Sequence, residues 1–338
     1  MSISNALNNA ASGLSASSRL ADTISNNVAN AMTPGFGKRT TELSSLSLGG
    51  YGSGVRISGT SRAENPYLTA ERRAMDAALG ATATRSEAWD RMMTAFGEPG
   101  SSSAVSSLAT ALETDLMSAS ASPQSMAKLS AAMTSADNFA KGLNRVSREN
   151  AQLRSEADAE IGRQVGLVND ALHDIDAINR KISILDLQGA DITGLQDERG
   201  RLVDQISSII PLKTAKRDGG QIAIYAANGG VLLDGRVWEL KFDRAPNGVT
   251  SDMVLGAPLS GLSQDQGAAG GPVPIATGTG PGLMDGGSLG ALFELRDRIV
   301  SAFEALEDAQ ATGPFADLPA GRFEVSETRR TTDDGGDA

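Results

Sequence analysis

Few residues of this chain belong to the types that carry out catalysis. The sequence of 338 residues contains one histidine, His173, and no cysteine. A nucleophile–histidine–acid triad would have to use His173, yet no serine lies in the tight turn that activates such a nucleophile. Leu172 and Asp174 flank His173 within a helical pattern. The sequence therefore predicts a surface histidine and no catalytic residue.

Two clusters of charged residues were considered as ligand sites. A metal site needs several convergent ligands, and Asp174 and Asp176 on one helix do not supply them. Asp197, Glu198 and Arg201 have helical spacing, which places both carboxylates within reach of the guanidinium. We predict that this second cluster forms ion pairs within its helix, and we predict no metal site.

One glycine-rich segment was considered as a phosphate-binding loop. Residues 278–282 read GTGPG, but the Gly-Lys-Ser/Thr ending is missing and no clear strand precedes them. A linker is the better interpretation. Since no other pattern predicts cofactor chemistry, we expect no bound cofactor and no enzymatic activity.

The composition narrows the class of partner. The net charge is −11 and no run of Lys or Arg occurs, which argues against nucleic acid or an anionic membrane. No apolar run approaches the roughly 20 residues that cross a bilayer. The N-terminus lacks the basic start and continuous apolar segment of a secretory signal. Aromatic residues make up only 4% of the chain, which favours long helices with thin cores.

The first predicted element of the chain is a long helix. Over residues 1–36, apolar side chains recur at steps of four and three, a heptad pattern of about 3.5 residues per turn. Two of the seven stripe residues are alanine and the helix is rich in Ser and Asn, so it is a poor isolated helix. We predict that it assembles against other helices. The apolar stripe consists of Ile3, Leu7, Ala10, Leu14, Ala21, Ile24 and Val28.

The rest of the chain changes periodicity twice. Apolar residues follow a helical period up to Pro211, alternate as in strands after it, and resume a helical period near Ser288. We predict a mainly α fold with an inserted small antiparallel β domain, in an elongated multi-domain arrangement built on a long-helix bundle. The predicted parts are an assembly helix at 1–36, an extended linker at 37–61, a helical bundle at 62–211 plus 286–310, the β domain at 212–285 and a disordered tail at 311–338.

A motif at the end of the first helix resembles a known family. Residues 25–36 read SNNVANAMTPGF, which is similar to the signature near the N-terminus of flagellar rod, hook and hook-associated proteins. Four later segments, at 54–72, 195–207, 229–235 and 286–297, resemble the hook-associated members in the expected order. The residues of the signature are Asn26, Asn27, Ala29, Asn30, Thr33, Pro34, Gly35 and Phe36.

The resemblance implies a structural subunit that joins hook to filament and has no enzymatic activity. It also implies export through the flagellar type III apparatus to an extracellular location. The implied partners are copies of the same chain, the hook protein, an adjacent junction protein and an export chaperone. Members of the family end in a second heptad helix, whereas residues 315–338 are polar. Either the C-terminus is truncated or frame-altered, or another subunit supplies the missing helix, and truncation is the favoured interpretation.

Three alternatives remain open from the residues. A hook or rod protein has the same terminal signature, although the long helical pattern at 124–187 speaks against it. A soluble exported helical binding protein would be a stable monomer with an ordered N-terminus. A hydrolase would depend on His173, and we expect no turnover.

Overall fold

The computed structural model describes residues 3–48, 51–250, 253–255, 258–265, 272–275 and 286–297. Predictions that concern the end of the bundle at 298–310, the tail at 311–338 and the glycine-rich loop at 278–282 lie outside these residues.

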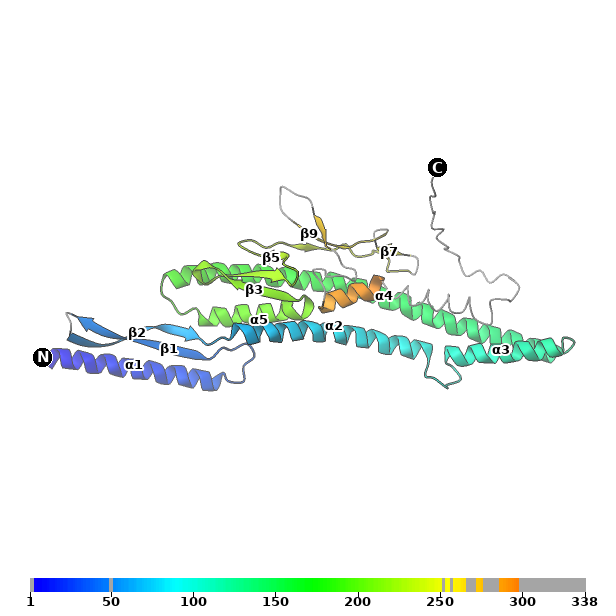
Figure 1. The fold of residues 1–338 in the computed structure, drawn as a ribbon, viewed down its shortest axis with the longest axis horizontal. Coiled ribbons are helices and arrows are strands. Elements are labelled where there is room, and N and C mark those ends of the chain that lie inside the picture. Colours follow the sequence, from blue (N-terminus) through cyan, green and yellow to red (C-terminus); the bar gives the residue numbers. More distant parts are fainter. Residues whose placement is uncertain are drawn as a thin grey trace, which may run out of the picture. The chain divides into compact units, whose positions relative to one another are not determined.

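The first part of the chain is a helix backed by a hairpin. Helix α1 (Ile3–Ala29) is followed by strands β1 (Arg39–Leu48) and β2 (Tyr51–Arg62). The strands pair antiparallel, with Arg39 opposite Arg62 at the open end of the hairpin. Figure 1 shows α1 lying along this hairpin. We call residues 3–62 the N-terminal module.

The hairpin corrects one prediction. Residues 37–61 were predicted as an extended linker, whereas most of them are paired in β1 and β2. The sequence here is rich in Ser and Gly, and its only clear alternation of apolar and polar residues, at Val55–Ile57, is short. Backbone pairing and contact with α1 stabilise the hairpin instead, and neither is visible as an apolar alternation.

Helix α2 (Pro66–Phe96) has clear local signals at both ends. The side chain of Asn65 accepts hydrogen bonds from the backbone N–H groups of Tyr67 and Leu68, and Pro66 occupies the first turn. Gly97 ends the helix with φ 87°. Helix α3 (Val105–Ala121) follows after a short loop and packs against the next helix.

Helix α4 (Met126–Leu187) spans 62 residues and is the main support of the fold. No proline interrupts it, and neighbouring elements pack along it, as a helix of this length requires. A turn at Gln188–Ala190 leads into α5 (Thr193–Ile209), which returns along α4. α2, α4 and α5 contact one another (Figure 1).

After Pro211 the chain forms short strands. β3 (Leu212–Lys216), β4 (Ile222–Ala226) and β5 (Val231–Leu233) make an antiparallel sheet in sequence order, with the one-turn helix η1 (Asp218–Gly220) between the first two. β6 and β10 flank β9 in a second antiparallel sheet, while β7 and β8 form a short parallel pair. Their bounds are β6 Leu240–Lys241, β7 Val254–Leu255, β8 Pro258–Leu259, β9 Leu262–Gln264 and β10 Val273–Ile275.

The helices and the inserted strands share one core. Buried side chains of α4 and α5 pack with Ile224 and Leu232 of the first sheet and Leu262 of the second. The chain then returns as a helix over residues 288–297, which adds Leu289 and Phe293 to the same core. The mainly α class with small antiparallel sheets is confirmed. The division into separate domains stays a prediction; among the described residues, buried side chains of the strands and of the helices form one cluster.

Two buried arginines tie the insert to the helices. Arg154 of α4 is 1% exposed and donates hydrogen bonds to the carbonyls of Thr250 and Met253 in the insert and of Arg296 in the returning helix. The Arg296 guanidinium pairs with Asp158 of α4 at 3.1 Å. Since buried charges require partners, these contacts hold the middle of the insert, at Thr250 and Met253, and the returning helix against α4.

Candidate assembly surface

Helix α1 uses its polar face to bind the hairpin. Asn9 donates to the carbonyl of Gly52, the Ser12 hydroxyl accepts from the N–H of Val55, and the Thr23 hydroxyl lies 2.6 Å from that of Thr41. Ala16, on the same face, is 4% exposed. The small and polar residues that make α1 a poor isolated helix are therefore those that fit it against β1 and β2.

The apolar stripe of α1 faces away from the hairpin. Ile3, Leu7 and Leu14 are 89%, 69% and 74% exposed, and Ile24 and Val28 are similarly exposed. Both alanines of the stripe, Ala10 and Ala21, are exposed as well. The stripe predicted from the heptad pattern thus forms one continuous free face. An exposed apolar stripe of this kind is a candidate interaction site.

The signature residues that follow the stripe form the turn from α1 into β1. The Asn27 side chain accepts from the N–H of Arg39 and donates to its carbonyl, both at 2.8 Å. Asn30 donates to the backbone and side-chain oxygens of Asn26, and Thr33 donates to Asn30. These bonds replace the helical ones that are lost where α1 ends.

The turn ends close to α5. Gly35 has φ 80°, and a Cβ placed there would lie 2.4 Å from Cγ of Arg201. Both the backbone conformation and the close approach require glycine. Next to it, the Arg39 guanidinium lies 5.1 Å from the centre of the Phe36 ring. Ala29 and Pro34 are exposed, so they can contribute to a surface.

The charged cluster of α5 has different partners from those predicted. Ion pairs within the helix, from Asp197 and Glu198 to Arg201, were expected. Instead Asp197 pairs with Arg39 and Arg62 of the hairpin. The prediction considered only helical spacing, and the true partners are more than 130 positions away in sequence.

Two other charged residues of α5 also bind outside the helix. Asp204 pairs with Arg72 and Arg73 of α2. Arg199 donates to the side chain of Asn179 and to the carbonyl of Gly220. Burial lowers the pKa of Arg199 to about 10, which still leaves it charged at neutral pH.

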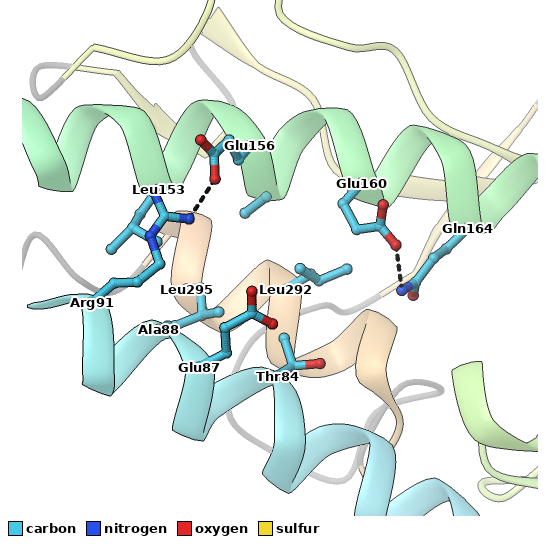
Figure 2. Close-up of a pocket in the computed structure, with 11 residues that line it drawn as sticks. Thr84, Glu87, Ala88, Arg91, Leu153, Glu156, Glu160, Gln164, Leu292 and Leu295 are labelled. Atoms are coloured by element: carbon cyan, nitrogen blue, oxygen red, sulfur yellow. Dashed lines mark hydrogen bonds and ion pairs between the residues drawn. The ribbon is translucent and has the colours of Figure 1, made fainter.

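A groove of about 330 Å³ lies between α2, α4 and the returning helix. Figure 2 shows Glu87, Glu156 and Glu160 around it, with Leu292 and Leu295 at its base. A hydrogen bond from Arg91 lowers the pKa of Glu156, and one from Arg163 lowers the pKa of Glu160. Both carboxyl groups are ionised near neutral pH, so neither has the raised pKa of a general acid.

The other sequence-predicted positions show no site chemistry. His173 is exposed and lies 2.9 Å from Glu239, as expected for a surface histidine. Within the described ranges, His, Cys, Asp and Glu side chains form no group of three that could hold a metal ion. The helices of the described part of the chain include none with the length and apolar character of a membrane span.

Two family models match different parts of the chain. The family model described as the flagellar hook-associated protein FlgK helical domain matches residues 89–313, which is more than half of the chain. The model described as flagella basal body rod protein matches residues 7–36, the stretch that contains most of the apolar stripe and the turn.

Individual relatives agree with the family model. Flagellar hook-associated protein 1 of Escherichia coli is 30% identical over 244 residues, covering 69% of this chain and 44% of that protein. The protein of the same name from Bacillus subtilis is 25% identical, covering 68% of this chain and 47% of the relative. The flagellar hook junction protein FlgK from Burkholderia pseudomallei has a similar fold, with a TM-score of 0.56 and 18% identity over 69% of this chain and 39% of that one. The chain thus spans less than half the length of these relatives.

Proposed function

We propose that this chain, which belongs to the family of flagellar hook-associated protein FlgK, is a structural subunit that joins the hook of the bacterial flagellum to its filament. It acts by assembly and not by catalysis. The observation that supports this role best is the free apolar stripe of α1, from Ile3 to Val28, on a helix whose polar face is already occupied.

The proposed mechanism of assembly is packing of the stripe against heptad helices of neighbouring subunits. An apolar face with a 3.5-residue period packs along a partner helix over its whole length. Its alanines allow two helices to approach closely, although each contact buries little area. Each contact is weak, but a subunit makes several of them in the assembly. Once one contact has formed, it raises the effective concentration of the surfaces that form the next.

The proposed partners follow from the family. They are copies of this chain, the hook protein and an adjacent junction protein, with an export chaperone before assembly. We propose that the chain reaches the outside of the cell through the flagellar export apparatus and remains part of the extracellular flagellum. The chain contains no cysteine, which fits a protein that must be able to unfold for export because no disulfide bond can form within it.

Deletion of the gene that encodes this chain tests the proposal. Cells without it should form hooks of normal length that lack filaments, and filament protein should accumulate in the medium. A plasmid copy should restore the filaments. Normal filaments on the deletion strain would overturn the proposed role.

A further inference from the structure

One buried carboxylate binds the base of the N-terminal module. Asp197 of α5 accepts a hydrogen bond from the N–H of Gly37 at 2.9 Å, from Nη2 of Arg39 at 3.2 Å and from Nε of Arg62 at 2.7 Å. The residue is only 8% exposed. Charge-assisted hydrogen bonds of this kind are among the strongest in proteins, and burial limits their screening by salt.

The three donors come from one place in the module. Gly37 lies just before β1, Arg39 begins β1, and Arg62 ends β2 directly opposite Arg39. All three therefore lie at the open end of the hairpin, the end that faces α5. Because α1 is hydrogen-bonded along the hairpin, a contact at this end acts on α1, β1 and β2 together.

Among the described residues, other links between the module and the helices are fewer, and they include an attraction of Asp191, just before α5, to the charges of Arg39 and Arg19. The chain itself continues through residues 63–65, which have no helix or strand structure, into α2. Close packing at Gly35 against Arg201 adds a steric contact but no charge. A short covalent connection by itself leaves two bodies free to reorient, since such motion is the default where the interface is small.

We propose that Asp197 is a positioning residue that fixes the direction in which the N-terminal module leaves the helical body, meaning α2 to α5 and the returning helix. The module and the body each keep their own internal contacts without it. The consequence for assembly rests on the proposed function: the apolar stripe of α1 meets its partners at one angle only while Asp197 holds the module.

Distance measurement between spin labels tests the orientation directly. The chain has no cysteine, so two introduced cysteines are the only labelling positions. Ser18→Cys in α1 and Lys181→Cys in α4 place one label on the module and one on the body, both at exposed positions. The full chain should give a narrow distance distribution, which Asp197→Asn should broaden to about twice its width because the module then samples several orientations.

Asp204→Asn is the matched control. It removes the same charge from the same helix, but Asp204 pairs with Arg72 and Arg73 inside the body. This variant should keep the narrow distribution. The proposal is overturned if Asp197→Asn leaves the distribution unchanged, or if Asp204→Asn broadens it equally.

A second label pair separates reorientation from unfolding. Ala83→Cys in α2 and Lys181→Cys lie within the body, at exposed positions. Their distance should stay narrow when Asp197→Asn is introduced. Broadening of this pair as well would overturn the proposal, because Asp197 would then support the body itself. The label distances decide the orientation even if the chain proves to have no role in the flagellum, so the two proposals can fail separately.

Discussion

Asn27 of α1 binds both backbone groups of Arg39 in β1, accepting from its N–H and donating to its carbonyl at 2.8 Å each. The Asn27 amide thus makes the two hydrogen bonds, to the N–H and to the C=O of Arg39, that a residue of a neighbouring strand would otherwise make. The bond pair therefore links the end of the helix to the start of the hairpin. It also gives a structural reason for the asparagine in the signature at residues 25–36.

Asn27→Ala should loosen this end of the hairpin without unfolding the body. Two hydrogen bonds are lost, at a net cost of about 1 kcal/mol each. We expect amide hydrogen exchange in β1 and β2 to become faster by roughly tenfold or more, with little change in α4. Asn8→Ala, at an exposed position of the same helix, is the control. Unchanged exchange in β1 would contradict the assigned role of Asn27.

Gly35→Ala should be destabilising through backbone strain. Alanine at φ 80° is strained, and its Cβ would lie 2.4 Å from Cγ of Arg201. We expect a loss of about 1–3 kcal/mol in the free energy of unfolding of the module, measured by urea titration. Gly13→Ala is the matched control: its Cβ meets nothing within 4 Å, so it should stabilise α1 slightly. Equal effects of the two substitutions would contradict the requirement for glycine at position 35.

Arg154→Lys should weaken the attachment of the insert. The guanidinium donates to three carbonyls, of Thr250, Met253 and Arg296, in a planar fork that an ammonium group does not reproduce. We expect a loss of about 3 kcal/mol in the free energy of unfolding, since buried acceptors are left unpaired. Arg163→Lys, in an exposed pair on the same helix, should change stability little. Similar midpoints for the two variants would contradict the buried network.

Stability should fall in acid partly through the groove between α2 and α4. The hydrogen bond from Arg91 lowers the pKa of Glu156 in the folded state. A group with a depressed folded pKa stabilises the protein above its unfolded pKa, about 4.3 for Glu, and this contribution disappears as the pH falls through the folded pKa. Glu156→Gln should therefore be less stable than the unmodified chain at pH 7, and the difference should shrink below about pH 4.

The control for the pH series is Glu198→Gln, at an exposed position of α5. Thermal unfolding of both variants from neutral to acidic pH gives the comparison. A Glu156→Gln difference that stays constant with pH would exclude the linkage to Arg91.

The sequence was sufficient for the parts of the fold that depend on local patterns. Pro211 marks the end of the last helix before the strands, and the change from a helical period to alternation after it marks the start of the strands. The heptad pattern likewise predicted the helix α1, and its stripe as an assembly surface stays a prediction. In each case a single segment contains the whole signal.

The parts that escaped prediction depend on residues far apart in the chain. The hairpin at β1 and β2 has Ser and Gly where strands usually have branched side chains, and its support comes from Ser12 and Asn27 of α1. The partners of Asp197 are similarly remote. Helical spacing predicted Arg201 as the partner, whereas in the folded chain Arg39 and Arg62 pair with the Asp197 carboxylate. Helical spacing identifies possible ion-pair partners within one helix. It gives no information about partners that folding brings from distant segments.

The free apolar stripe is the surface on which the proposed function depends, and Leu14 lies at its middle with 74% of its area exposed. Leu14→Asp places a charge where a neighbouring helix would pack, but it disturbs no contact with the hairpin. The variant should fold normally, as circular dichroism and the unfolding midpoint would show. Ser15→Asp adds the same charge at an exposed position on another face of the helix and should behave like the unmodified chain.

The most direct test is gold labelling of flagella from cells whose only copy of the gene carries an epitope tag in the exposed turn at 188–190. The unmodified chain and Ser15→Asp should give a narrow band of label between hook and filament. Leu14→Asp should give no band and hooks without filaments. Label along the whole hook, or a normal band and normal filaments with Leu14→Asp, would contradict assembly at the junction through the apolar stripe.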